Sequence, residues 1–273
     1  MLRRMSMPLS SFTKSLAATA VLFTGGLAHA GVTIETTRGA ESAATMYLEG
    51  ERMRIDGADK TGTATSVIID GGGKKLIVVE EKKKSYTELT ESDMKRMKVQ
   101  VDAMRAQMEE RMKTMPPEQR KQVEAMMAGM GGAPGKPAKP PVLKFEKQGQ
   151  KKTINGFSCE MYRVLKDGVA SEEDCIAAWS ASTVQKSDLA GLRKFGEEMM
   201  KNFGGAGARD QLQLDQLDKY PGIPISRVPL EADGTRGPEE QIKSIKRGSV
   251  PAAKFAVPAG YTKKTLPTGP AQP

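Results

Sequence analysis

Hydrophobic and polar residues alternate with a period of two between residues 32 and 89, which is typical of strands with one buried face. Turn-forming glycine and aspartate residues separate five strand candidates: Val32–Thr37, Thr45–Leu48, Arg52–Ile55, Thr65–Ile69 and Lys75–Val79. In the second and third candidates, Met46 and Met53 fall on the apolar side of the alternation. Ser85–Leu89 then ends this predicted meander.

The pattern changes to a helical period after this meander. Thr90 is a suitable N-cap, and Asp93 occupies the acidic position of a capping box. Apolar residues then recur at steps of three and four, at Met94, Met97, Val101, Met104, Met108, Met112 and Met115. Pro116 and Pro117 end this helix, because proline lacks an N–H donor and restricts the residue before it. We expect a second helix over residues 118–128.

Strand signals resume after a glycine- and proline-rich linker at residues 131–141. The strand-like segments of this second half are 142–148, 159–165, 175–180, 223–230, 241–247 and 252–257. A helix is expected over Ser187–Phe203, with Phe195 on its apolar side, and a short one over residues 210–220. The polar end of the chain from Thr262 is expected to be a tail, disordered over residues 266–273.

Residues 1–30 have the three parts of a cleavable signal peptide. Arg3, Arg4 and Lys14 form a positive region, Ser15–Leu27 is a short apolar core, and residues 28–30 read Ala-His-Ala. The apolar core is too short to span a bilayer, which takes about 20 residues. We therefore expect cleavage after Ala30 and a periplasmic protein.

Removal of this segment changes the chemistry available to the chain. The only histidine, His29, leaves with it, so the remaining chain has no imidazole for nucleophilic catalysis or zinc binding. Residues 31–273 keep 39 Lys and Arg against 33 Asp and Glu, a net charge of +6. Aromatic residues are few, which disfavours nucleic acid as a partner. No cofactor or metal motif is present, and we expect a protein that is not an enzyme.

Cys159 and Cys175 lie on either side of the turn signal Asp167–Gly168. In a hairpin with a three-residue loop they would be direct cross-strand partners, close enough to bridge. One cysteine pair in an exported protein predicts one disulfide.

The methionine stripe of the first helix has several interpretations. It can be an adaptable apolar surface that packs or contacts lipid, a copper(I) site, or a consumer of oxidant that forms sulfoxides. Acidic clusters such as Glu172-Glu173-Asp174 are interpreted as solvated. Lys82-Lys83-Lys84 is the candidate for peripheral contact with an anionic membrane surface.

Several short motifs together resemble a known kind of exported bacterial protein. The motifs are MYLEGERMRIDG, KKKSYTEL, PPEQRKQVEAMM, NGFSCEMYRV and KFAVPAGYTK. The chain resembles an uncharacterised family carrying a domain of unknown function. Its plan is similar to the LolA/LolB-like lipoprotein-carrier fold, in which a half-open β-barrel has a helical lid; Phe255-x-x-Pro258-x-Gly260 is the matching chain ending.

This resemblance implies an α+β fold: a strongly curved antiparallel sheet whose concave face is covered by the methionine-rich arm. We expect one domain over residues 31–265, with the helical insertion at 90–130. It would bind a lipid, a lipoprotein acyl chain or a hydrophobic segment of an envelope protein. The residues expected to line the site are Met46, Met53, Met97, Met104, Met108 and Phe195. The alternatives are copper(I) binding or oxidant buffering, and a structural envelope protein without a ligand.

Overall fold

The alternating segments form one large sheet. The computed structural model describes residues 31–58, 62–72, 74–120, 141–203 and 219–265. In this part of the chain the strands are β1 (Gly31–Arg38), β2 (Glu41–Glu49), β3 (Arg52–Ala58), β4 (Ala64–Asp70), β5 (Lys75–Glu80), β6 (Ser85–Thr90), β7 (Leu143–Ile154), β8 (Phe157–Lys166), β9 (Val169–Ala178), β10 (Gly222–Pro229), β11 (Glu240–Gly248) and β12 (Thr262–Lys264). Their order across the sheet is β12-β6-β5-β4-β3-β2-β1-β11-β10-β9-β8-β7. All six strands predicted before residue 90 are present.

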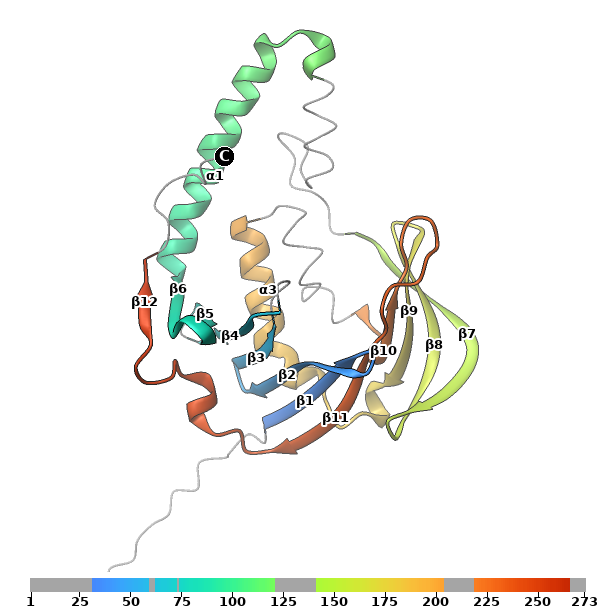
Figure 1. The fold of residues 1–273 in the computed structure, drawn as a ribbon. Helices are drawn as coiled ribbons and strands as arrows, with labels where there is room; N and C mark the ends of the chain where they lie inside the picture. The colour runs from blue at the N-terminus through green and yellow to red at the C-terminus, as the bar shows by residue number, and fades with distance from the viewer. Residues whose placement is uncertain (1–30, 59–61, 73, 121–140, 204–218, 266–273) are drawn as a thin grey trace, which may run out of the picture.

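The sheet consists of two antiparallel meanders joined through the first strand. β1 pairs with β2 on one side and with β11 on the other, so Ile34 lies between Met46 and Ile245. The neighbouring pair β10–β11 is matched at only two positions, at Ser226 and Arg227. The sheet is strongly curved, and its edge strands β12 and β7 leave it open, as expected for a half-open barrel (Figure 1).

The helix that fills the inside of the curve is α3 (Ala190–Phe203), which follows the 3₁₀ turns η2 (Trp179–Ala181) and η3 (Lys186–Leu189). Leu192 and Phe195 of α3 are buried with Met53, Ile69 and Ile225 in the main core. Apolar residues of both meanders therefore share one core, closed by α3 (Figure 1).

The methionine-rich helix α1 (Glu91–Thr114) has a different position from the one expected. It continues directly from β6, contacts β6 and α3 near its base, and rises away from the sheet (Figure 1). The expectation that this helix covers the concave face is therefore wrong for residues 91–114, because α3 already occupies that side. The predicted second helix begins at residue 117, one residue earlier than expected, but residues 121–130 of the arm lie outside the described part.

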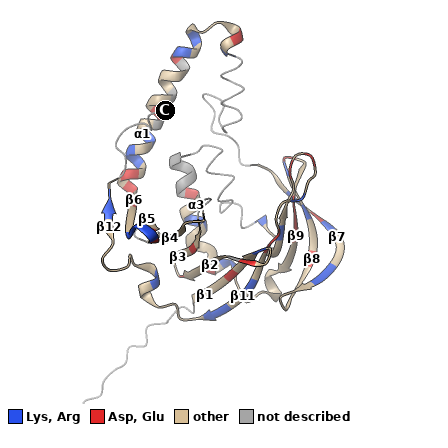
Figure 2. Ribbon diagram, viewed as in Figure 1, with Lys and Arg blue, Asp and Glu red and all other residues tan. Residues whose placement is uncertain are grey.

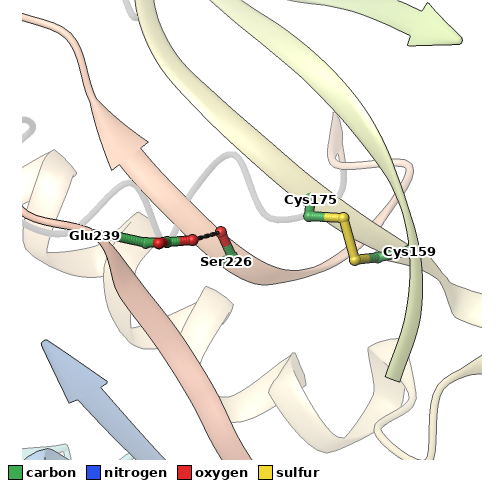
Figure 3. Close-up of a disulfide and its surroundings, with 4 residues drawn as sticks. All are labelled: Cys159, Cys175, Ser226 and Glu239. Atoms are coloured by element: carbon green, nitrogen blue, oxygen red, sulfur yellow. Dashed lines mark hydrogen bonds between the residues drawn. A yellow bond between two sulfur atoms is a disulfide. The ribbon is translucent and has the colours of Figure 1, made fainter. Parts of the chain in front are cut away.

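The predicted disulfide joins Cys159 of β8 to Cys175 of β9, with a Cα–Cα distance of 5.3 Å (Figure 3). Its place in the ladder differs from the expectation. The hairpin turns through Asp167 and Gly168, both with positive φ, which is the two-residue connection favoured between antiparallel strands. Cys175 lies opposite Met161, so the bridge runs diagonally between the strands.

A β-bulge makes this bridge possible. Leu165 pairs with Ala170 but Val164 pairs with Glu172, so Ser171 is an extra residue in β9. If the ladder continued without this shift of register, Cys175 would lie opposite Glu160, on the other face of the sheet from Cys159. The bulge is held from both sides: the Ser171 hydroxyl donates to the Val164 carbonyl, and the Ser171 carbonyl accepts from the Leu230 amide.

The last described residues form a strap across the other face of β3 and β4. The 3₁₀ turn η5 (Ala252–Phe255) stands where a strand over 252–257 was predicted, because the prolines at 251 and 258 cannot donate to a ladder. The Arg52 guanidinium lies 4.7 Å from the centroid of the Phe255 ring, and Arg54 donates to the Lys254 carbonyl.

The strap ends as a strand rather than as the polar tail expected from Thr262. β12 pairs with β6 in parallel, and Lys263 and Lys264 form ion pairs with Glu88 and Glu80. The Tyr261 hydroxyl donates to the Glu81 carboxylate at the same edge. The expectation for Thr262–Lys264 was therefore wrong; a three-residue polar strand carries no period that would reveal it.

Replacing both bridge cysteines should measure how strongly this hairpin depends on its covalent link. We expect Cys159→Ser/Cys175→Ser to lower the free energy of unfolding by about 3 kcal/mol, the value typical of a closed loop of this size. Urea unfolding of the variant and of reduced wild type should agree. Equal stability of oxidised, reduced and serine proteins would contradict the role assigned to the bridge.

Candidate functional site

Helix α1 starts in a fixed position at the end of β6. The Asp93 amide donates to the Thr90 hydroxyl, and the Thr90 amide donates to the Asp93 carboxylate, which is the predicted capping box. Hydrogen bonds from Thr90 lower the pKa of Asp93, so the cap remains ionised at neutral pH. Lys74 of the β4–β5 turn adds a 3.1 Å ion pair to Glu91.

The far end of α1 is closed by an arginine from the next helix. The Arg120 side chain donates to the Met112 carbonyl at 2.9 Å and to the carbonyls of Lys113 and Met115. These carbonyls belong to the last turn, where intrahelical partners run out. Both ends of α1 are thus capped by side chains, and ion pairs such as Lys98–Asp102 and Lys113–Glu110 lie along it (Figure 2).

The methionines of α1 differ sharply in exposure. Met94 at the base is 2% exposed and Met112 near the tip is buried. Between them, Met97 is 38% and Met104 48% exposed, and Met108 is half-buried. These last three residues, here called the thioether stripe, follow one side of the helix at steps of seven and four. Lys, Arg, Asp and Glu residues are interspersed along the helix (Figure 2).

The structure separates the predicted lining residues into two groups. Met53 and Phe195 are buried in the core, and Met46 packs against it half-buried. Met97, Met104 and Met108 lie on α1, outside that core. The six residues therefore do not line one cavity. Sequence periodicity placed these residues on apolar faces of strands and helices, but it does not show which helix packs against the sheet.

Two small hollows lie in the described part of the surface. One, of about 220 Å³, is lined by Gly50, Asp188 and Arg247, among others. The other, of about 270 Å³, lies beside the disulfide and is lined by Cys159, Tyr162, Ile176 and neighbouring residues. Neither contains a residue of the thioether stripe.

No helix in the described ranges is both long and apolar enough to cross a bilayer. Among the same residues, no group of three or more His, Cys, Asp or Glu side chains is arranged to hold a metal ion. Lys82, Lys83 and Lys84 are exposed around the turn η1 (Glu81–Lys83), and their contact with a membrane surface stays a prediction. Copper(I) binding by the methionines stays a prediction as well.

A buried charged cluster lies between β9 and β10 and was not expected from the sequence. Asp174 is 0% exposed and Glu172 is also buried, although both were interpreted as solvated. Arg227 Nε lies 3.0 Å from the Glu172 carboxylate and 3.8 Å from that of Asp174, and an Arg227 nitrogen donates to the Tyr220 hydroxyl. The sequence does contain a signal for this burial. Glu172 and Asp174 follow the same two-residue spacing as Ile176, so the three side chains lie on one face of β9.

The cluster holds more negative than positive charge. Neither Asp174 oxygen accepts a hydrogen bond within normal geometry, and one guanidinium serves two carboxylates. Burial raises the pKa of Asp174 from its ordinary value of 3.8 to about 7, against the opposing attraction of Arg227. Burial also raises the pKa of Tyr220, so its hydroxyl stays protonated. The group joins two strands through buried charged side chains, and its raised pKa places the titration of Asp174 near neutral pH.

A family model described as a domain of unknown function, DUF4412, matches residues 94–261. The chain belongs to the DUF4412 family. The match includes α1, the disulfide hairpin, α3 and the strap as far as Tyr261. It confirms the expectation of a family with a domain of unknown function. A search among curated protein sequences found no match to this DUF4412 protein.

Solved structures give distant similarities. An uncharacterised conserved protein from Thermus thermophilus is 9% identical with a TM-score of 0.42, covering 87% of this chain and 91% of that one. The MucA/MucB complex of Pseudomonas aeruginosa gives 13% identity and a TM-score of 0.33, with 87% of this chain and 58% of that chain covered. MucB in complex with MucA(peri) gives 11% identity and a TM-score of 0.27, with 87% of this chain and 57% of that chain covered. This DUF4412 protein thus spans less than two thirds of the matched chains of the two MucB complexes.

The buried cluster predicts a pH-dependent stability. The folded state binds the Asp174 proton more tightly than the unfolded state, so its stabilising effect is complete below pH 3.8 and is lost as the pH rises through about 7. We expect Asp174→Asn to reduce the loss of unfolding free energy between pH 5 and pH 8 by about 2 kcal/mol. Urea unfolding at both pH values measures it.

The matched control is Glu173→Gln, on the opposite face of the same strand, where Glu173 is paired with Arg163 and Arg236. The only histidine in the sequence is His29, so imidazole titration within residues 31–273 does not mask the effect. An unchanged pH dependence in Asp174→Asn would show that this carboxyl does not titrate in the range assigned to it.

Proposed function

We propose that this DUF4412 protein is a non-enzymatic binding protein that acts outside the cytoplasm, and that its thioether stripe receives a hydrophobic segment of a partner protein. The observation that carries the proposal is the exposure of Met97 and Met104, at 38% and 48%, on a helix that rises from the sheet with both ends capped. Exposed apolar side chains in a row on an ordered element are typical of binding surfaces.

The inside of the sheet supports this choice of surface. Met53 and Phe195, expected to touch a ligand, instead pack against the protein's own side chains. An acyl chain needs an enclosed apolar cavity that covers most of its surface. The stripe on α1 is open, so it suits a partner element that lies along the helix and buries it from one side. We therefore prefer a protein segment to a lipid or lipoprotein acyl chain as the ligand.

The chemistry of methionine fits such a role. The side chain is unbranched and its thioether is polarisable, so it adapts to apolar partners of irregular shape. Burying one methionine contributes about 1.5–3 kcal/mol relative to leaving it in water. The two most exposed members of the stripe can therefore supply much of the free energy of a moderate interaction.

The cysteine pair and the first thirty residues of the sequence support the proposed compartment. A structural disulfide such as Cys159–Cys175 persists in oxidising surroundings and is rare in the cytosol. The signal-peptide pattern of residues 1–30 points the same way, although those residues lie outside the described part. Both features support a periplasmic location. The lack of histidine after residue 30 and of a catalytic motif supports a binding role rather than an enzymatic one.

Charge placed on the stripe should remove binding. We expect Met97→Glu/Met104→Glu to weaken binding of a fluorescent amphipathic peptide of leucine, glutamine and glutamate at least tenfold, because two apolar contacts become desolvated charges. Fluorescence anisotropy measures the affinity, and circular dichroism confirms that the helix is retained.

The matched control is Val99→Glu. Val99 is 69% exposed on the same helix, about 200° around its axis from Met97, and should leave the affinity unchanged. Equal loss in both variants would contradict a one-sided site. Binding of a fluorescent fatty acid without binding of the peptide would overturn the proposed partner class in favour of an acyl ligand.

A further inference from the structure

The methionines of the described chain range from buried to exposed, and those at the two extremes differ in chemical accessibility. Met53 and Met94 are each 2% exposed and Met112 is also buried, whereas Met97 and Met104 show more than a third of their surface. Methionine oxidation requires the oxidant to reach sulfur, so the two extremes should react at different rates. Met94 and Met97 lie three residues apart on one helix, which makes them a comparison in the same local structure.

We propose that Met97 and Met104 form a reversible oxidative modification site that controls the binding surface of α1. A peroxide transfers one oxygen atom to each thioether sulfur. The O–O bond breaks, a new S–O bond forms, and both S–C bonds remain. Sulfur is oxidised by two electrons, and hydrogen peroxide is reduced to water. The control of binding rests on the function proposed above; the modification itself rests on the exposure of the Met97 and Met104 residues.

The consequence of this step follows from polarity. A sulfoxide is a polar, chiral group, whereas the thioether is apolar and flexible. A partner segment packed on the stripe would have to bury the new S=O group without a hydrogen-bond donor, which is unfavourable. Oxidation therefore releases the partner, and reduction of the sulfoxide restores the apolar surface. A bound partner also shields the sulfur atoms, so binding and oxidation exclude each other.

The fold limits the modification to the surface. The core methionine Met53 is enclosed with Leu192 and Phe195, and Met94 is buried at the base of α1. The caps of α1 are made by Thr90, Asp93 and Arg120, none of which a peroxide oxidises readily. Oxidation of the stripe thus changes binding while the helix and the core stay intact.

The test treats the purified full chain with hydrogen peroxide and follows each methionine by peptide mapping and mass spectrometry. We expect Met97 and Met104 to form sulfoxides at least tenfold faster than Met94 and Met53, with the circular dichroism spectrum unchanged. Addition of the amphipathic peptide should slow both fast reactions. Oxidation of Met94 as fast as that of Met97 would overturn the assignment of the site.

Peptide affinity, measured on the same samples, tests the control of binding. It should fall at least tenfold after oxidation and return after treatment with methionine sulfoxide reductases A and B. Met97→Leu/Met104→Leu should bind the peptide before and after peroxide alike. Unchanged affinity of fully oxidised wild type would overturn the proposed regulation of binding by oxidation while leaving the proposed function intact. Failure of the untreated protein to bind the peptide would overturn both the proposed function and the regulation of binding by oxidation. The rates of sulfoxide formation would still decide whether Met97 and Met104 are the modification site.

Discussion

The pairing of β1 with β11 is the constraint on which the rest of this fold depends. β1 continues the first meander and also forms a full ladder with a strand that lies more than 200 residues later. Without it, β1–β6 and β7–β10 would be two separate sheets, each with an apolar face in water. The adjoining β10–β11 ladder is too short to hold the halves together by itself. Contact between the two ends of the chain therefore creates the shared core.

Once the two halves form one curved sheet, the position of each helix follows. α3 follows β9 after the turns η2 and η3 and lies inside the curve, where Leu192 and Phe195 complete the core. α1 begins at β6, near the opposite edge, where the strap is also attached through β12. The apolar residues inside the curve of the sheet are covered by α3, and Met97 and Met104 of α1 stay exposed. The exposure of Met97 and Met104 is thus a result of sheet topology rather than of composition.

The sequence predicted those features that depend on local pattern. Period-two alternation located the strands before residue 90, Thr90 and Asp93 located the start of α1, and the single cysteine pair predicted its own bridge. It did not predict features decided by distant contacts. The extra residue Ser171 determines which face Cys175 occupies, yet a bulge leaves no reliable local signal. The positions of α1 and of Phe195 depend on which apolar stripe packs against the sheet, and periodicity treats both helices alike.

The buried cluster around Asp174 shows a different kind of limit. Glu172 and Asp174 look solvated in sequence because acidic residues are seldom buried without partners, and their partner Arg227 lies more than 50 residues away. Their burial is costly, and an apolar set of similar volume would often be as stable. The cluster lies between β9 and β10; on its other side β10 forms the two-position ladder to β11, where Ser226 donates to Glu239 (Figure 3). At a seam with so few main-chain bonds, the Ser226–Glu239 hydrogen bond adds a side-chain contact across it, while the charged cluster adds ion pairs to the longer β9–β10 ladder on the other side of β10.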